Sequence, residues 1–549
     1  MPFGADHTIR AIGPNSRHSR LGEGPDTPGD TPFADLHEVR KRPVQGPQTR
    51  YSSDVPLDPD ACYRALRTRD ARFDGRFFTA VRTTGIYCRP VCPARTPKRE
   101  NCLFLPCAAA AQEAGYRPCL RCRPEAAPGT PAWVGTSATV SRALGLISEG
   151  TLDGDSVEKL ASRLGIGERH LRRLFLLHLG ASPLAVALTR RTLFAMNLID
   201  ETNLPMAEVA LSSGFSSIRR FNAAIRVTTG MSPRELRRIR PRPRIAAGSS
   251  TISLRLPFRP PYDWEAIRDF LALRAIPGVE AVGPDGYRRS LSLDGVHGAV
   301  DVRKPAGQNH LIARIQLSSA TPLIQVTERL RALFDLSADP LEIAKCLERD
   351  PRLRKRVRAR PGLRIPGAWD PFELAVRAIV GQQISVRGAT TLAGRLAESY
   401  GEKLDLEGFE DLRFVFPRPD ALARADLTSV GLTRTRADAV SALASSVASG
   451  ELRLDASHSL EKSEAMLRAI PGIGSWTAQY IAMRALQEPD AFPESDLGIR
   501  RALSTGRPPT PAQVAQMAEA WRPWRGYAAV YLWTGGASPA APRRRSPHS

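Results

Sequence analysis

Six of the eight cysteines lie between Cys88 and Cys122, and their spacing restricts how that segment can fold. Four of them form two close pairs, Cys88-x3-Cys92 and Cys119-x2-Cys122. Two such pairs separated by a loop can converge on one tetrahedral zinc ion. In a reducing compartment the clustering favours metal or reactive thiolate over disulfides. From the spacing alone, a zinc ribbon that only stabilises a small domain remains the alternative.

The charge of the chain favours a polyanionic partner. Its 549 residues carry 78 Lys and Arg against 56 Asp and Glu, a formal net charge of +22. This balance is typical of nucleic-acid binding, although a generally arginine-rich surface is the plainer explanation. No apolar stretch is long enough for a transmembrane helix, and the N-terminus lacks a signal-peptide pattern. We therefore expect a cytoplasmic protein with no membrane partner.

Shifts in composition predict several domains, as the length also does. The fold class we expect is multidomain and mainly α with α+β parts. Strands are predicted at 251–256, 287–293 and 311–317, and helices at 264–273 and 323–333. Two Pro-rich linkers are expected at 124–131 and 240–250. The predicted segments are a disordered extension (1–50), a small α/β cysteine domain (51–127), a helical DNA-binding domain (136–240), an α+β domain (250–346), an all-α domain (347–537) and a disordered tail (538–549).

Residues 136–240 contain two helix-turn-helix patterns. Ser156 begins one helix, glycines at 165 and 167 interrupt it, and a second helix starts at Glu168; residues 206–227 repeat the scheme. Polar side chains on the second helices can face the major groove or the phosphates, although a solvated surface explains some of them equally well. These candidates are Arg169, His170, Arg172, Arg219, Arg220 and Asn222.

The cysteine segment resembles the N-terminal domain of the Ada family over residues 58–127. The match includes residues 74–95, which end in GIYCRPVCPAR, and residues 115–122, which read GYRPCLRC. The resemblance implies that Cys88, Cys92, Cys119 and Cys122 bind one Zn²⁺. It also implies that Cys88 irreversibly accepts a methyl group from methylphosphotriesters in DNA. Three further residues would contact the DNA backbone: Thr84, Arg95 and Arg117.

Zinc-bound sulfur stays a thiolate at neutral pH, which makes such an acceptor chemically reasonable. Methylation removes one negative charge beside DNA phosphates and should strengthen DNA binding. The segment TGMSPREL (229–236) resembles the AraC family signature, and GASP (180–183) echoes it. Together these features predict a damage-responsive activator that binds promoter DNA and RNA polymerase. By default we expect a monomer.

Residues 251–537 resemble the AlkA type of 3-methyladenine DNA glycosylase, in the helix-hairpin-helix superfamily. Three motifs carry the match: residues 362–385, the segment IPGIGSWTAQY (470–480), and WRPWRGY (521–527). Glycines in the PGIG turn let a backbone phosphate approach the following helix. Gly472, Gly474 and Thr477 are therefore predicted DNA contacts, and the resemblance implies a monovalent cation at the hairpin.

Asp496 is the predicted catalytic residue, because it lies where this family keeps its catalytic aspartate. A carboxylate stabilises the positive charge that develops on the sugar during N-glycosidic cleavage. A helix cap is the usual role of such an aspartate, and Glu494 is the nearest rival carboxylate. Trp476, Tyr480 and Trp533 are predicted to line an aromatic pocket for a flipped base, with core packing as the alternative. Gln383 aligns with the residue that fills the vacated space.

Two absences refine the prediction. Strand-cleaving relatives carry a lysine where this chain has Trp476, so we expect a monofunctional glycosylase that leaves an abasic site. The Pro-Cys-His-Arg motif of alkylguanine methyltransferases is absent, so repair of O6-methylguanine is not expected. A transcriptional regulator with a degenerate glycosylase half is the alternative for the whole chain. The remaining cysteines are expected to have no chemical role: Cys102 and Cys107 as small buried or surface thiols, and Cys62 and Cys346 as core residues.

Overall fold

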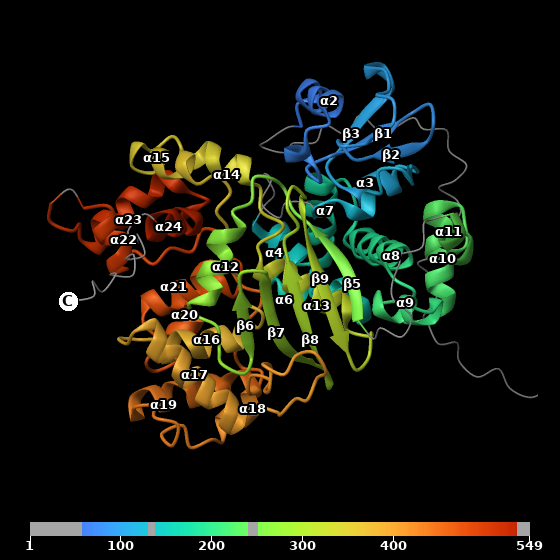
Figure 1. The fold of residues 1–549 in the computed structure, drawn as a ribbon. Helices are drawn as coiled ribbons and strands as arrows, with labels where there is room; N and C mark the ends of the chain where they lie inside the picture. Colours follow the sequence, from blue (N-terminus) through green and yellow to red (C-terminus); the bar gives the residue numbers. More distant parts are fainter. Residues whose placement is uncertain (1–56, 130–137, 240–250, 505, 535–549) are drawn as a thin grey trace, which may run out of the picture. The chain divides into compact units, whose positions relative to one another are not determined.

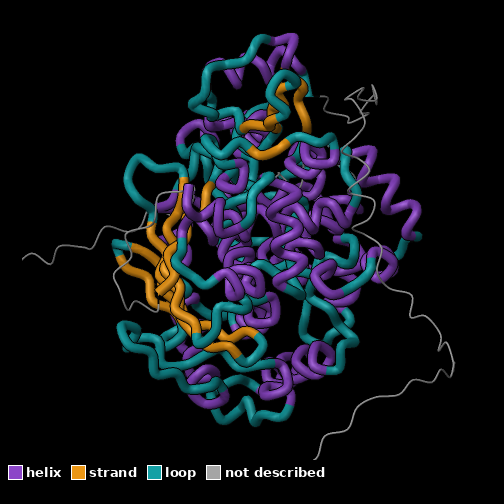
Figure 2. Tube along the Cα trace, turned by 90° about the vertical axis from the view of Figure 1, so that its right-hand side faces the viewer, coloured by secondary structure: helices purple, strands orange, loops and turns teal. Residues whose placement is uncertain are grey.

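The computed structural model describes residues 57–129, 138–239, 251–504 and 506–534 (Figure 1). Within these ranges the strands form two separate sheets, and helices make up most of the remaining structure (Figure 2). The predicted disordered extension, the C-terminal tail and the 240–250 linker lie outside the described residues. The fold class predicted from the sequence is confirmed: several domains, mainly α, with two parts that contain a sheet.

The cysteine domain is built on a four-stranded sheet in the order β3-β1-β2-β4. Strand β2 is antiparallel to β1 and parallel to β4, which brings the two cysteine pairs to neighbouring strands. Pro124–Ala126, expected to be part of a linker, instead forms a short 3₁₀ helix with Pro124 and Glu125 buried. The elements are α2 (Pro59–Thr68), β1 (Phe78–Val81), β2 (Ile86–Cys88), β3 (Cys102–Leu105), α3 (Ala108–Glu113) and β4 (Arg117–Pro118).

The next domain is entirely helical within residues 138–239. Ser156 caps α6 through a hydrogen bond from the Lys159 amide, and Ser217 caps α10 in the same way from Arg220. Both predicted helix-turn-helix motifs are present, as α6–α7 and α9–α10. The helices are α4 (Ala138–Ser148), α5 (Thr151–Gly154), α6 (Val157–Arg163), α7 (Glu168–Leu179), α8 (Pro183–Glu201), α9 (Met206–Ser212), α10 (Ile218–Thr229) and α11 (Pro233–Ile239).

A five-stranded antiparallel sheet follows, in the order β5-β9-β8-β7-β6. The three predicted strands are present, but the sequence did not reveal β6 and β8. In β8, Ala299 and Val300 pack into different hydrophobic clusters, so both faces are buried and no polar–apolar alternation appears. The elements are β5 (Thr251–Pro257), α12 (Trp264–Ala272), β6 (Glu280–Gly283), β7 (Gly286–Leu293), β8 (Val296–Arg303), β9 (His310–Leu317) and α13 (Leu323–Leu333).

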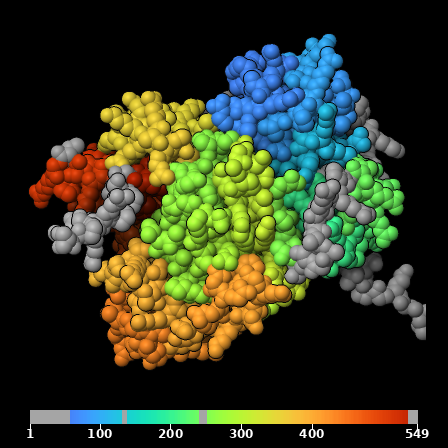
Figure 3. Space-filling model, viewed as in Figure 1, coloured from blue at the N-terminus to red at the C-terminus, as the bar shows by residue number. Residues whose placement is uncertain are grey.

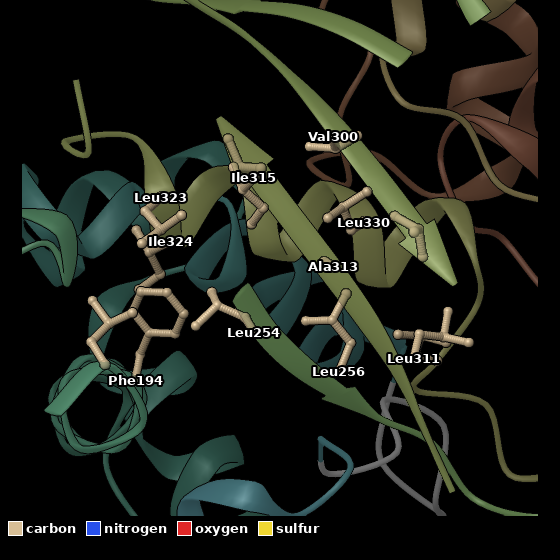
Figure 4. Packing of buried hydrophobic residues seen from close by; sticks show 14 of the residues in the cluster. Phe194, Leu254, Leu256, Val300, Leu311, Ala313, Ile315, Leu323, Ile324 and Leu330 are labelled. Carbon is tan, nitrogen blue, oxygen red and sulfur yellow. The ribbon is translucent and has the colours of Figure 1, made fainter. Parts of the chain in front are cut away.

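One face of this sheet packs against α13. Figure 4 shows Leu254 of β5 and Ile315 of β9 lying opposite Ile324 of α13, with Phe194 of α8 at the end of the same cluster. All four side chains are buried. The apolar face predicted from the alternation of the strands is therefore a core face that helices cover.

Beyond residue 339 the described chain consists of helices and loops, and these helices form two packed groups. The first, the α15 group, shares one hydrophobic core among α14, α15, α22, α23 and α24. The second, the α16 group, contains α16 to α21 around another core. The helices are α14 (Pro340–Leu347), α15 (Pro351–Ala359), α16 (Pro371–Val380), α17 (Val386–Tyr400), α18 (Pro419–Ala423), α19 (Arg434–Ala448), α20 (Leu460–Arg468), α21 (Ser475–Arg484), α22 (Leu497–Ala502), α23 (Pro511–Ala518) and α24 (Arg525–Thr534).

The described helices are too short or too polar to span a membrane singly. The pair α7 and α8 meets the criterion of length and composition only when taken together, and the two helices are bent by 59° at their junction.

A buried ionic cluster joins the sheet to α16. Arg289 of β7 lies between two carboxylates, donating to Glu280 Oε1 at 3.3 Å and to Glu373 Oε2 at 2.7 Å. Arg377 donates to Oε2 of Glu280 and Oε1 of Glu373, both at 3.1 Å. Tyr287 also donates to Glu280 at 2.6 Å. The charges are paired and hydrogen-bonded, as buried charges must be.

Replacing Arg289 with Met is expected to lower the free energy of unfolding by about 3–5 kcal/mol, because Glu280 and Glu373 keep their charges but lose a buried partner. Thermal unfolding followed by circular dichroism would measure the effect. Arg303→Met is the matched control, since Arg303 is 48% exposed and should change stability by less than about 0.5 kcal/mol. Equal midpoints for both variants would contradict the predicted role of the cluster.

Candidate functional site

The four predicted zinc ligands come together at one end of the small sheet. The Sγ atoms of Cys88, Cys92, Cys119 and Cys122 all lie within 4.8 Å of one another. Sulfurs around a tetrahedral zinc ion stand about 3.8 Å apart for Zn–S bonds of about 2.3 Å, so the cluster needs little adjustment. A four-cysteine donor set is also the one that structural zinc sites use. The residues therefore fit Zn²⁺.

Cys88 differs from the other three cysteines in its exposure. Its side chain is partly accessible, whereas Cys92, Cys119 and Cys122 are buried. The Arg89 amide donates to Cys122 Sγ at 3.3 Å, which withdraws electron density from a buried sulfur. Arg89 in turn forms a buried ion pair with Asp74 and donates to the Cys122 carbonyl at 3.1 Å. Sequence reasoning missed Asp74 and Arg89 as positioning residues, although both lie inside the motif.

The four cysteines outside the zinc cluster do not form a second metal-binding group among the described residues. Burial raises the pKa of the Cys62 thiol to about 12 and that of Cys107 to about 11, so both stay protonated and unreactive. Cys102 is buried as well. Cys346 packs against the core of the α15 group but is only partly buried, and its sulfur lies 3.4 Å from the Arg522 carbonyl oxygen.

The predicted backbone contacts of the cysteine domain lie on the surface. Thr84, Arg95 and Arg117 are all exposed. Thr84 is in the turn between β1 and β2, and Arg117 of β4 pairs with Ile86 of β2, two residues before Cys88. Arg82, which the sequence analysis did not select, is also exposed next to this turn. Positive side chains are therefore exposed on β4 and beside the turn that precedes β2, the strand that ends at Cys88.

The six polar candidates of the helix-turn-helix motifs are exposed on α7 and α10. Arg172 forms an i,i+4 ion pair with Glu168 at 2.6 Å, and Arg173 Nη2 lies 3.2 Å from His170 Nδ1. These two contacts leave the side chains at the surface. Arg219 and Asn222 lie on the first turns of α10, the part of a recognition helix that reaches bases.

The predicted hairpin joins α20 to α21. Gly472 has a left-handed backbone (φ 88°), and a Cβ there would lie 2.8 Å from the Ala439 methyl group, so glycine is required. Gly474 begins α21 without a side-chain cap, which leaves the first amides of the helix available to an anion. The Thr477 side chain is buried, and its hydroxyl accepts from Gln382 Nε2 at 3.1 Å, so the predicted DNA contact of this residue would use its backbone amide.

The turn before α17 is tied to this hairpin. Gln382 Nε2 also donates to the Gly472 carbonyl at 2.9 Å, and Arg436 donates to the Gln382 carbonyl. Gln383, the next residue, is exposed and has a left-handed backbone (φ 56°) that is uncommon outside glycine. Gln383 therefore projects from a turn held in place by its neighbours. The monovalent cation expected at the hairpin stays a prediction.

Asp496 lies where the α15 group meets the α16 group. Its side chain accepts a hydrogen bond from the Ile499 amide at 2.8 Å and so caps α22. Asp496 therefore does have the helix-cap role that the sequence analysis gave as the alternative. Its two oxygens also accept from indole nitrogens: Oδ2 from Trp476 Nε1 at 2.9 Å and Oδ1 from Trp533 Nε1 at 3.1 Å. Asp496 remains partly exposed. No hydrogen bond of the described residues links the rival Glu494 side chain to either indole.

The three predicted aromatic residues pack side by side around this carboxylate. The rings of Trp476 and Tyr480 stack with centroids 5.2 Å apart and an interplanar angle of 9°, and Trp533 lies 6.3 Å from Tyr480. All three are partly exposed, which distinguishes them from ordinary core residues. We call Asp496, Trp476, Tyr480 and Trp533 the aspartate–aromatic cluster.

Two arginines outside the motifs act on Tyr480. Arg484 donates to its hydroxyl at 2.6 Å, and Arg274 approaches it from the loop after α12. Burial by itself would raise the pKa of the Tyr480 phenol, but the two guanidinium groups outweigh burial and lower that pKa. The sequence analysis selected neither arginine: the i,i+4 spacing from Tyr480 was the available signal for Arg484, whereas no sequence signal connects Arg274 with this cluster.

Comparison with known proteins assigns the parts of the chain. The family described as "Metal binding domain of Ada" matches residues 61–125, "Helix-turn-helix domain" matches 160–239, and "AlkA N-terminal domain" matches 253–370. The order of the three families agrees with the order expected from the motifs.

Individual relatives agree with these families. The "Probable bifunctional transcriptional activator/DNA repair enzyme AlkA" of Mycobacterium tuberculosis is 45% identical over 481 residues, 87% of this chain and 96% of the relative. "DNA-3-methyladenine glycosylase 2" of Escherichia coli is 37% identical over 281 residues, 51% of this chain and 95% of the relative. The "Bifunctional transcriptional activator/DNA repair enzyme Ada" of Escherichia coli is 40% identical over 129 residues, covering 24% of this chain and 35% of the relative.

Proposed function

Because this chain belongs to the family of bifunctional transcriptional activator/DNA repair enzymes of the AlkA type, we propose that its two activities reside in Asp496 and Cys88. The chain combines a DNA-3-methyladenine glycosylase with an Ada-type methyl-accepting regulator, and double-stranded DNA is its partner. The observation that carries the assignment of Asp496 is its pair of indole hydrogen bonds beside stacked aromatic rings.

Asp496 stabilises the transition state of base release. Cleavage of an N-glycosidic bond gives the sugar oxocarbenium character, and a fixed carboxylate offsets that positive charge. The indoles of Trp476 and Trp533 donate to Asp496 from both sides and so fix its orientation. Alkylated purines already carry positive charge, so the base leaves without a strong acid. Tyr480 and Trp476 offer electron-rich faces that favour such cationic bases.

The damaged nucleotide reaches these residues by leaving the base stack. The α21 amides after Gly474 bind a backbone phosphate, and Gln383 enters the space that the base vacates. Both roles are consistent with the exposed positions of Gly474 and Gln383. Trp476 occupies the position where strand-cleaving relatives carry lysine, so no Schiff base forms and the product is an abasic site.

Cys88 accepts the methyl group. Zinc, when bound by the four cysteines, keeps their sulfurs as thiolates. The Cys88 sulfur attacks the methyl carbon of a phosphotriester in line, the carbon–oxygen bond breaks, and the phosphodiester leaves as an anion. The new carbon–sulfur bond is a thioether, so each molecule reacts once. Cys88 is the partly accessible sulfur of the cluster, which supports its choice over the three buried ones.

Methylated Cys88 carries one negative charge less, which strengthens binding to the DNA backbone through Thr84, Arg95 and Arg117. The helices α7 and α10 then bind a promoter through their exposed polar side chains. One chain supplies two recognition helices, which is what a dimer otherwise provides, and this supports a monomer. As an activator it engages RNA polymerase at the promoter, and it works in the cytoplasm, where the chromosome lies.

Incubation of the full chain with methylated duplex DNA should release free 3-methyladenine and leave an intact strand with an abasic site. Chromatography of the released base and alkali-dependent strand breakage would measure both products. Borohydride should trap no covalent protein–DNA adduct, because Trp476 provides no amine. Absence of released base would favour a regulator with a degenerate glycosylase half, and a trapped adduct would contradict the monofunctional mechanism.

A further inference from the structure

A strongly basic surface lies on α15, outside the hairpin and the aspartate–aromatic cluster. Seven basic residues and one acidic residue lie between Arg349 and Arg360. Leu353 and Val357 anchor the helix in the core that also contains Trp521 and Ile499. The α15 basic surface consists of the exposed side chains of Arg349, Arg352, Arg354, Lys355, Arg358 and Arg360. In Figure 3 the α14–α15 segment, drawn in yellow, lies at the molecular surface.

Carboxylates compensate only part of this charge. Arg352 pairs with Asp350 at 2.6 Å, and Arg358 pairs with Glu348 at 2.9 Å. Arg360 pairs with Asp263 at 2.9 Å. Arg354 donates only to carbonyl oxygens, at 2.9 Å to Glu348 and 3.4 Å to Arg349. Across the described residues, neither Arg354 nor Lys355 has a carboxylate within ion-pair distance. Two exposed positive charges on adjacent residues are therefore available to an external anion.

The spacing of these charges also disfavours the helix. Arg354 and Arg358 are four residues apart, and Lys355 and Arg358 are three apart, so like charges are neighbours on one helix face. Glu348 supplies a counter-charge to Arg358, whereas the neighbouring charges of Arg354 and Lys355 are not offset by a carboxylate of the described residues. A bound polyanion would provide that counter-charge along the whole face.

Helix α15, which carries the basic surface, contacts α22, the helix that Asp496 caps. Arg356 Nη2 donates to the carbonyl oxygen of Ala502, the last residue of α22. Asp496 caps the other end of the same helix, and a helix of this length spans about 9 Å. Arg501, also on α22, is exposed. Positive charge thus continues from the neighbourhood of Asp496 to α15, a distance comparable to a few nucleotides of a duplex.

We propose that the α15 basic surface binds the backbone phosphates of duplex DNA flanking the damaged nucleotide, an inference that rests on the proposed glycosylase activity. The chemistry required is a row of phosphates, and a duplex held at Asp496 brings such a row past the end of α22. Contacts of this kind hold the duplex in position and read no sequence. They extend the DNA-binding site beyond the α20–α21 hairpin.

The test compares the full chain with its Arg354→Gln/Lys355→Gln variant on a duplex that carries a stable abasic-site analogue. Binding is measured by fluorescence anisotropy over a range of salt concentrations. Each lost phosphate contact lowers the slope of log affinity against log salt by about 0.9, so a decrease of about 1–2 is expected, with roughly 5- to 50-fold weaker binding at moderate salt. Both proteins keep the same helix-turn-helix residues, so the difference reports on α15.

Arg314→Gln/Lys403→Gln is the matched control, because it removes two exposed positive charges from β9 and from the loop after α17. Its salt slope should equal that of the full chain. An unchanged slope in the α15 variant, or an equal decrease in the control, would overturn the proposal. The α15 variant should unfold at the same temperature or higher, since like-charge repulsion is relieved, and a lower midpoint would contradict that premise.

Uncharged methylphosphonate linkages can locate the contact. Placed about two to five nucleotides from the lesion, they should weaken binding of the full chain but add little to the loss already present in the α15 variant. If the affinity lost through the methylphosphonate linkages simply adds to the affinity lost in the α15 variant, the assignment of α15 to these phosphates is overturned. The duplex with the abasic-site analogue is bound but not cleaved, so the binding result is separate from the proposed activity. Absence of base release by the unmodified chain would reject the glycosylase activity. The salt slopes would still decide whether α15 binds DNA.

Discussion

Replacing Asp496 with Asn is expected to slow the release of alkylated bases by about 100- to 1,000-fold. The amide keeps the size of the side chain and can still accept from the Ile499 amide, but it no longer carries the charge that offsets the oxocarbenium ion. Single-turnover release of 3-methyladenine from methylated duplex DNA would measure the effect. DNA affinity should change far less than the rate, because the hairpin is untouched.

Two further variants distinguish this role from a structural one. Glu494→Gln removes the neighbouring carboxylate and should leave the rate within about twofold of the unmodified chain, since Glu494 lacks the indole contacts. Trp533→Phe keeps an aromatic ring but removes the donor 3.1 Å from Asp496 Oδ1, and a loss of about 10-fold is expected. A rate for Asp496→Asn close to that of the unmodified chain, with Glu494→Gln inactive, would transfer the catalytic role to Glu494.

Replacing Cys88 with Ser should abolish methyl transfer while base release continues. Serine lacks the polarisable thiolate that attacks the methyl carbon, and the two activities reside in different domains. Incubation with DNA that contains methylphosphotriesters, followed by peptide mass spectrometry, should show one added methyl group on Cys88 of the unmodified chain. Zinc content measured on the same samples would report whether the remaining thiols still hold the metal.

Two controls separate acceptor chemistry from loss of the metal site. Cys102→Ser removes a buried thiol outside the cluster and should leave methyl transfer intact. Asp74→Asn keeps all four thiols but weakens the ion pair that positions Arg89, so a partial loss of about 10-fold is expected with zinc retained. Methylation found on another cysteine, or none despite bound zinc, would mean that the cluster is a structural zinc site only.

Most of the proposed functional residues were accessible to sequence reasoning because they lie in short motifs, and Asp496 was found through its position in the family resemblance. The positions of Cys88 and Cys92 follow from one strand and the turn after it, and Gly472 and Gly474 define one tight turn. Local backbone geometry fixes such residues within a few positions, so their spacing is visible in the sequence. Strand β8 was missed for the opposite reason, since burial on both faces removes the alternation that marks a strand.

The sequence alone selected the residues to which we assign the chemistry: four cysteines with zinc spacing, two helix-turn-helix motifs, a glycine hairpin and one aspartate after it. Only the tertiary structure decided that Cys88 is the accessible thiol, that Trp533 reaches Asp496 from α24, and that α15 meets the end of α22. Hydrophobic burial is non-directional, so an apolar pattern specifies which face of a helix is buried but not which distant helix covers it. Those pairings arise when the two helix groups pack together, and they bring residues far apart in the chain to a single carboxylate.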